Sequence, residues 1–300
     1  MQHATVVVRP AAALRLRAFQ QLTNPGITAF VGLSAAAGYI VSARTTADPV
    51  SLTLVVIATM AMSGGAAAFN HISERHLDAR MRRTRRRPLP AGPNGVRAAT
   101  NFAWALTAFG AALAIATLPA LTFVLLAACH VTYVYVYTPL KLKSEWCTLV
   151  GAIPGALPVL AGSAAAGATA DVAALALTGV LFAWQIPHFY AIGWRTRDDY
   201  AAAGFRMMTV RDESGAHTAA TALGFAIAMQ VCTVLLTRAI GASLIAAVCA
   251  HAAGTAYIVA ALWFLQRRDQ TRAGWLFVVS LVSLPVILAA LILSTLTAAP

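Results

Sequence analysis

Nine stretches of about 20 mostly apolar residues follow one another along this 300-residue chain. A helix needs about 20 apolar residues to cross the hydrocarbon core of a bilayer, which is roughly 30 Å thick. The stretches lie near 25–43, 51–72, 99–117, 119–138, 147–167, 172–193, 217–237, 241–264 and 273–297. Because 59% of the residues are hydrophobic and only 11% are charged, a soluble domain could not bury this apolar surface. The sequence therefore predicts an all-α polytopic membrane protein with nine transmembrane helices around a central cavity.

The charged residues gather on one side of these predicted helices. With the N-terminus placed in the cytoplasm, every Lys and Arg except Arg44 and Arg238 falls on the cytoplasmic side. This distribution follows the positive-inside rule, so the formal charge of +12 reflects membrane orientation and does not indicate nucleic-acid binding. Most of the acidic residues lie on the same side, although topology does not require them there. We therefore expect a multi-pass protein of a bacterial-type inner membrane, with a cytoplasmic lead (1–24), a single domain (25–297) and an active site at the cytoplasmic face.

A polar helix end follows the second apolar stretch. Asn70, Glu74 and Asp78 are spaced i, i+4, i+8, which places them on one face of a helix over about 12 Å of its axis. Such oxygens suit Mg²⁺, which commonly takes one or two carboxylates and completes its shell with phosphate and water. The run of arginines that follows includes Arg80, Arg83 and Arg87. Guanidinium groups pair phosphate oxygens, so the pattern indicates a diphosphate site; the alternative is a solvated helix end whose arginines only set the topology.

Two further segments on the predicted cytoplasmic side carry aromatic and charged residues. The first follows the fourth apolar stretch and holds Tyr137, Lys141 and Lys143. It is also compatible with an interfacial aromatic belt with basic anchors. The second segment ends the sixth stretch and holds Trp184, Gln185, Pro187, His188, Phe189, Tyr190, Arg197, Asp198 and Asp199. We expect the proline to interrupt the helix locally.

These three segments resemble the signatures of the UbiA-type intramembrane prenyltransferases, and more narrowly of their haem O synthase branch. The first string is Asn70-xxx-Glu74-xxx-Asp78-xx-Met81-x-Arg83-Thr84-xx-Arg87-Pro88-Leu89. The second is Tyr137-Thr138-xx-Lys141 followed by Thr148-xx-Gly151-xxx-Gly155-Ala156-x-Pro158. The third is Trp184-Gln185-x-Pro187-His188-Phe189 with Asp199-Tyr200-xx-Ala203-Gly204-xxx-Met208. The chain departs from the branch at Glu74, where an Asp is usual, and at His76, where another acid is usual.

The resemblance implies transfer of a farnesyl group from farnesyl diphosphate to a vinyl group of haem b, giving haem O, with Mg²⁺-assisted loss of pyrophosphate. The implied metal ligands are Asn70, Glu74, Asp78, Asp198 and Asp199, which with His188 form the catalytic set. The implied diphosphate-binding residues are Arg80, Arg83, Arg87, Lys141, Lys143 and Arg197. The implied pocket for the acceptor and the allylic cation comprises Tyr137, Trp184, Gln185, Phe189 and Tyr190. The implied partners are the lipid bilayer and a downstream haem A synthase or terminal oxidase assembly.

His188 is the residue that bears most directly on the acceptor. Imidazole can ligate haem iron, imidazolium can pair a propionate, and either ring form can take part in proton transfer. The alternative is a neutral, hydrogen-bonded histidine that only packs at a helix end.

Two other functions remain open on the sequence. A prenyltransferase for a quinone-type aromatic acceptor would share the acidic segments, although the third string disfavours it. A small polytopic transporter would share the helices and the mid-span prolines. Against a transporter, the apolar stretches contain no pair of acids near the middle of the membrane.

Overall fold

The computed structural model describes residues 18–84, 92–168 and 171–297, and in this part of the chain it contains helices and no strands. Nine spans in the described residues are long and apolar enough to cross a membrane, which confirms the predicted helices. The spans are α2 (Pro25–Ala43), α3 (Pro49–Asp78), α4 (Gly92–Thr117), α5 (Ala120–Val131) with its continuation, α7 (Cys147–Ala165), α8 (Val172–Arg195), α11 (Ala216–Ala239), α12 (Leu244–Gln266) and α13 (Gln270–Thr297). The continuation of α5 is a π-helical segment, η2 (Thr132–Tyr137), followed by α6 (Thr138–Leu140). Short elements also lie between the spans: η1 (Arg44–Thr46), α9 (Arg197–Ala202) and α10 (Met208–Arg211).

Local signals in the sequence account for the helix boundaries. Asp48 caps α3 by accepting hydrogen bonds from the backbone N–H groups of Val50 and Ser51, and Asp171 caps α8 in the same way. The predicted hairpin between the third and fourth spans is confirmed, because α4 ends at Thr117 and α5 begins after Pro119. The predicted interruption at Pro187 is wrong, since α8 is continuous through this residue. A proline removes one backbone donor, and packing on both sides of α8 holds the helix together despite that loss.

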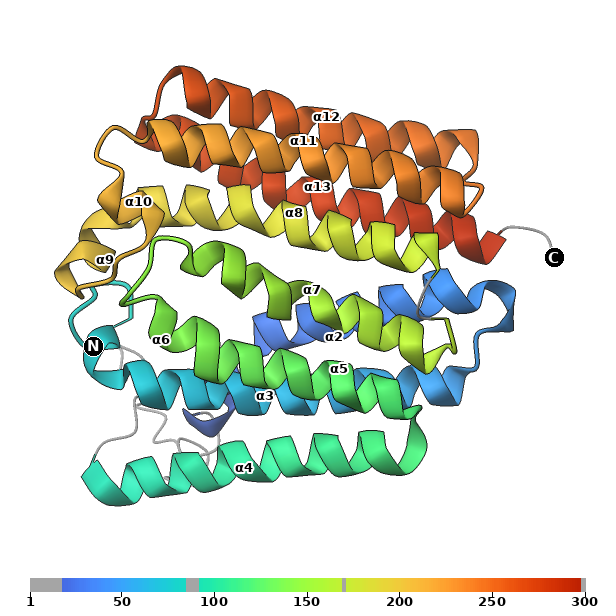
Figure 1. Cartoon of the computed structure of the whole chain (residues 1–300), viewed down its shortest axis with the longest axis horizontal. Coiled ribbons are helices and arrows are strands. Elements are labelled where there is room, and N and C mark those ends of the chain that lie inside the picture. Colours follow the sequence, from blue (N-terminus) through green and yellow to red (C-terminus); the bar gives the residue numbers. More distant parts are fainter. Residues whose placement is uncertain (1–17, 85–91, 169–170, 298–300) are drawn as a thin grey trace, which may run out of the picture.

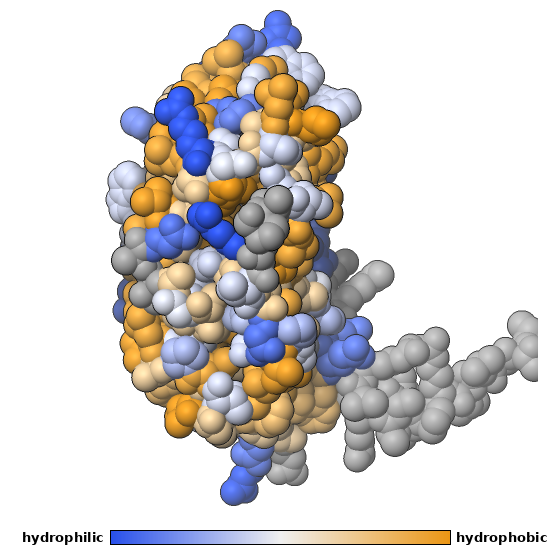
Figure 2. Space-filling view, turned by 90° about the vertical axis from the view of Figure 1, so that its right-hand side faces the viewer, coloured by the Kyte–Doolittle hydropathy of each residue, from blue (hydrophilic) through white to orange (hydrophobic). Residues whose placement is uncertain are grey.

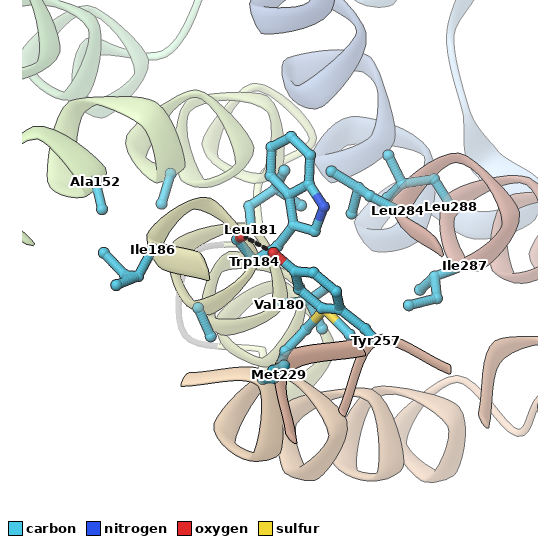
Figure 3. Close-up of a cluster of buried hydrophobic side chains, with 14 of the residues drawn as sticks. Ala152, Val180, Leu181, Trp184, Ile186, Met229, Tyr257, Leu284, Ile287 and Leu288 are labelled. Atoms are coloured by element: carbon cyan, nitrogen blue, oxygen red, sulfur yellow. Dashed lines mark hydrogen bonds between the residues drawn. The ribbon is translucent and has the colours of Figure 1, made fainter. Parts of the chain in front are cut away.

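The spans form one bundle with α8 near its centre (Figure 1). Helix α2 packs on α3 and α7, α7 packs on α5 and α8, and α8 packs on α11 and α13. The main apolar core surrounds α8, where the Tyr257 hydroxyl donates to the Trp184 carbonyl over 2.9 Å among Met229, Leu284 and other apolar side chains (Figure 3). The elements α9 and α10 lie at one end of the bundle, which we call the acidic end because Asp78, Asp198 and Asp199 lie there. The opposite end shows a few hydrophilic residues scattered among apolar ones (Figure 2).

Two glycines allow α2 and α7 to approach closely. A Cβ at Gly38 would overlap the backbone carbonyl of Val159, and a Cβ at Gly162 would overlap that of Ala35. The Ser163 hydroxyl also donates to the Gly38 carbonyl over 3.2 Å. Small residues at helix contacts have this effect in membranes, where van der Waals packing drives association.

Replacing Gly162 with Ala should therefore destabilise the bundle by about 1–3 kcal/mol, because the added methyl meets backbone that cannot move aside cheaply. The matched control is Gly224→Ala in α11, where the new methyl meets open space. Thermal unfolding of the two variants in detergent compares them. Equal stability of both variants would mean that α2 and α7 do not pack as described.

Candidate active site

Three segments that are far apart in the sequence meet at the acidic end of the bundle. The backbone N–H of Arg83, just past α3, donates to Oδ2 of Asp199 on α9 over 3.2 Å. The backbone N–H of Arg206 donates to the Lys141 carbonyl, past α6, over 2.9 Å. Beneath these contacts lies an apolar cluster formed by Met81, Cys147, Ala203, Phe205 and Met207. The three segments singled out in the sequence therefore form one structure (Figure 1).

The acidic face of α3 is buried. Asn70, Glu74 and Asp78 are 6%, 8% and 4% exposed, and they share one face because they are spaced by four residues. Nδ2 of Asn70 donates to the Thr138 hydroxyl over 3.1 Å, so the amide oxygen takes no part in that bond. Helix α3 runs past its predicted end at 72 to Asp78, which holds all three side chains on one rigid element. Buried carboxylates require compensation by cations or hydrogen bonds.

Lys141 supplies the cation for Glu74. Its Nζ lies 2.7 Å from Oε1 of Glu74, and both side chains are 11% exposed. The same ammonium lies 4.6 Å from the centroid of the Tyr137 ring, which packs against Gly151. Burial alone would lower the pKa of Lys141, but Tyr137 and the Glu74 carboxylate outweigh this effect and raise the pKa above its ordinary value. Lys141 thus supplies a buried cation inside the acidic end.

The side-chain oxygens at the acidic end could supply some, but not all, of the ligands that Mg²⁺ needs. In the described ranges, no group of three or more His, Cys, Asp and Glu side chains is arranged to hold a metal ion. Glu74 and Asp78 are nevertheless buried carboxylates one helical turn apart, and Mg²⁺ commonly uses one or two carboxylates together with substrate phosphates. Asp199 accepts the Arg83 N–H, whereas Asp198 is exposed. The residues present therefore fit a metal completed by a bound diphosphate.

The predicted phosphate-binding residues differ in their surroundings. Arg83 extends Nη2 to 3.4 Å from the Tyr200 hydroxyl, and the Arg197 guanidinium lies 4.5 Å from the Trp194 ring. Arg80 and Lys143 are exposed at the same end of the bundle. Arg87 lies outside the described residues. The structure therefore pairs Lys141 with the buried Glu74, whereas Arg83 contacts Asp199 and Tyr200 on α9.

Tyr137 of the predicted acceptor pocket lies in η2, and the other predicted residues fall into two groups along α8. Trp184 and His188 stack at 4.6 Å between ring centroids, and Phe189 lies beside them at 5.4 Å from the His188 ring. Gln185 instead donates to the backbone carbonyls of Ala152 and Leu181, and Tyr190 is fully buried in the core. Only the first group forms a compact aromatic cluster around the histidine. The Tyr190 hydroxyl has no hydrogen-bond partner in the described part of the chain.

Sequence reasoning missed two residues of α13 that complete this cluster. Phe277 lies 5.3 Å from the His188 ring, and the Ser280 hydroxyl lies 2.7 Å from its Nδ1. The sequence did offer one signal for Ser280, which is a serine within an apolar span. Polar groups at membrane depth are costly and usually have a partner, so this serine could have been expected to bond to another helix.

The bundle has the fold of membrane prenyltransferases of known structure. It aligns with digeranylgeranylglyceryl phosphate synthase at a TM-score of 0.79 and 14% identity, covering 94% of this chain and 99% of that one. It also aligns with a UbiA homologue from Archaeoglobus fulgidus bound to DMAPP and Mg²⁺, at a TM-score of 0.65 and 17% identity, covering 91% of this chain and 98% of that one. At these identities the likeness concerns the fold alone.

The sequence itself narrows this class to one family. Residues 31–284 match the UbiA prenyltransferase family, and the chain belongs to it. The chain is 36% identical to the protoheme IX farnesyltransferase of Opitutus terrae over 299 residues, which cover 96% of this chain and 97% of that protein.

Proposed function

We propose that this membrane protein transfers a farnesyl group from farnesyl diphosphate to a vinyl group of haem b, giving haem O. The observation that carries the proposal is the similarity to a protoheme IX farnesyltransferase along nearly the whole length of both chains. The aromatic cluster around His188 also supports it, because a flat, apolar macrocycle needs aromatic surfaces and an imidazole can address its iron.

At the acidic end, the chain acts on the diphosphate. Glu74 and Asp78 would hold Mg²⁺, with Asn70, Asp198 and Asp199 as further oxygen donors of the same end. When bound, Mg²⁺ supplies positive charge at the leaving diphosphate. Lys141 and Arg83 pair phosphate oxygens, which stabilises the negative charge that develops as the bond between farnesyl C1 and the diphosphate oxygen breaks. The electron pair of that bond leaves with the diphosphate.

In the acceptor half of the reaction, the vinyl π electrons form the new carbon–carbon bond to farnesyl C1. The positive charge then rests on the vinyl carbon next to the macrocycle, where a water molecule adds and releases a proton. Tyr137, Trp184 and Phe189 provide aromatic faces that stabilise cationic carbon. Because water must stay away from the allylic cation until the carbon–carbon bond has formed, the apolar surroundings of the aromatic cluster favour transfer over hydrolysis.

The proposal includes an orientation and a destination. Besides its three aspartates, the acidic end carries most of the Lys and Arg residues of the chain. By the positive-inside rule, this distribution supports a cytoplasmic location for that end. Haem O would then pass within the same membrane to a haem A synthase or a terminal oxidase assembly.

Expression in cells that lack their own haem-prenylating enzyme tests this function. Extracted pigments should contain haem O in addition to haem b, and cells that express the Asp78→Asn variant at the same level should contain haem b alone. Haem b alone in both cultures, with the wild-type protein inserted and folded, would refute the proposal.

Removing divalent cations is expected to stop turnover by the purified protein, and adding Mg²⁺ should restore it. The reason is that the buried carboxylates of α3 require a metal to receive an anionic substrate. Turnover is followed by release of pyrophosphate. Full turnover in excess EDTA would contradict a metal at Glu74 and Asp78.

A further inference from the structure

One buried serine of α13 contacts the candidate acceptor residue on α8. Ser280 is 0% exposed and its Oγ lies 2.7 Å from Nδ1 of His188. A second hydrogen bond also joins Ser280 to α8, because Nε1 of Trp184 donates to the Ser280 carbonyl over 2.9 Å. A single position of α13 therefore fixes both stacked rings.

The hydrogen bonds around Ser280 define which nitrogen of His188 carries the proton. The Ser280 hydroxyl donates to the Phe277 carbonyl over 2.5 Å, and two oxygens this close require the hydrogen between them. A serine hydroxyl has one hydrogen, so it has none left for the histidine and must accept from it. Nδ1 of neutral His188 is therefore protonated, and Nε2 carries the lone pair.

Nε2 makes no hydrogen bond to the described part of the chain, while three aromatic rings hold the imidazole in place. Trp184 stacks on it at 21° between ring planes, and Phe277 and Phe189 lie on other sides. The imidazole thus has a defined tautomer, a defined orientation and an unused lone pair. This is the usual arrangement of a histidine that ligates a metal, whose other ring nitrogen donates to a fixed acceptor.

We propose that Ser280 is a positioning residue that holds His188 as the Nδ1-protonated tautomer, so that Nε2 ligates the iron of the haem acceptor. The inference rests on the proposed haem acceptor. It assigns to α13 a part in acceptor binding that the three sequence strings do not contain.

The test compares two buried serines of α13 by replacing each with alanine. Ser283 is 2% exposed and its hydroxyl donates to the Val279 carbonyl over 2.8 Å, so it resembles Ser280 but does not contact His188. Ferric haem b is titrated into each purified variant in detergent, and the absorption spectrum reports whether imidazole ligates the iron. Ser280→Ala should weaken haem binding about 10- to 100-fold and change the ligation spectrum, as loss of such a partner does at metal sites. Ser283→Ala should leave both unchanged, and Ser280→Thr, which keeps the hydroxyl, should restore the spectrum.

A second measurement does not depend on haem. Nitrogen-15 spectra of histidine-labelled protein, with the His188 signal assigned by its absence from His188→Gln, report which ring nitrogen is protonated. We expect protonated Nδ1 in the wild type and a mixture of tautomers in Ser280→Ala. Protonated Nε2 in the wild type, or the same haem spectrum with and without the Ser280 hydroxyl, would overturn the inference while leaving the proposed function intact. A wild-type protein that binds no haem would instead refute the proposed function.

Discussion

Replacing Glu74 with Gln is expected to reduce the turnover of the inserted, folded protein at least about 100-fold. Because Glu74 is one partner of the buried pair with Lys141, the variant should also unfold more easily than the wild type. The substitution removes one buried negative charge with little change in shape. Without that charge, the acidic face of α3 attracts a divalent cation less strongly, and Lys141 loses the carboxylate that holds it 2.7 Å away. Asp78→Asn should have a comparable effect, because it removes the other buried carboxylate of the same face.

Glu145→Gln is the matched control for this prediction. Glu145 also lies at the acidic end and faces a cation, but its carboxylate is 3.9 Å from Arg211 and the two side chains are 41% and 56% exposed. An exposed pair of this kind contributes little. Turnover is measured by pyrophosphate release at saturating substrates, with thermal unfolding as the check on folding. A Glu74→Gln protein as active as Glu145→Gln would remove the basis for a metal on α3.

Replacing Lys141 with Met should lower both stability and catalytic efficiency. Removal of one partner of a buried ion pair leaves the other charge uncompensated, which costs about 3–5 kcal/mol of folding free energy. The loss of a charge-assisted contact to the diphosphate costs on the order of 1.5–3 kcal/mol of transition-state stabilisation, or about one to two decades in kcat/KM. Unfolding in detergent and kcat/KM for farnesyl diphosphate measure the two effects separately.

Lys143→Met provides the comparison, since Lys143 is exposed and only two residues away. It removes the same charge from the same loop, so it should affect topology as Lys141→Met does but leave stability nearly unchanged. If Lys141→Met instead scrambled membrane orientation and the correctly inserted fraction had normal kinetics, the basic loop would serve topology alone.

The fold was predictable from the sequence because membrane helices follow from the length and apolar content of single segments. Each of the nine spans has its own signal, and Pro119 marks the hairpin between two of them. The acidic face of α3 could also be predicted from the sequence, since the i, i+4 spacing within one helix fixes which side chains share a face. The prediction at Pro187 failed because a rule for isolated helices was applied where packing on several neighbours keeps α8 continuous.

Contacts between distant segments could not be read from spacing. Lys141 was predicted to bind phosphate, and the structure additionally pairs it with Glu74, which lies in another segment. Gln185 and Tyr190 were predicted to face an acceptor, which stays a prediction, and the structure adds that Gln185 bonds to backbone carbonyls and that Tyr190 is fully buried. Ser280 belongs to none of the three sequence strings, and only the packing of α13 on α8 reveals its hydrogen bond to His188. Periodicity gives the face of a helix, whereas tertiary packing decides what that face meets.

Competition between two acceptors tests the central claim most directly. The purified protein in lipid nanodiscs receives farnesyl diphosphate, Mg²⁺, haem b and a phenolic quinone precursor, and mass spectrometry identifies every prenylated product. We expect the haem to gain one farnesyl group and one hydroxyl group, with the phenol unchanged and the product absent for Asp78→Asn. A prenylated phenol with unchanged haem would contradict haem farnesylation and would make this chain a prenyltransferase for quinone-type acceptors.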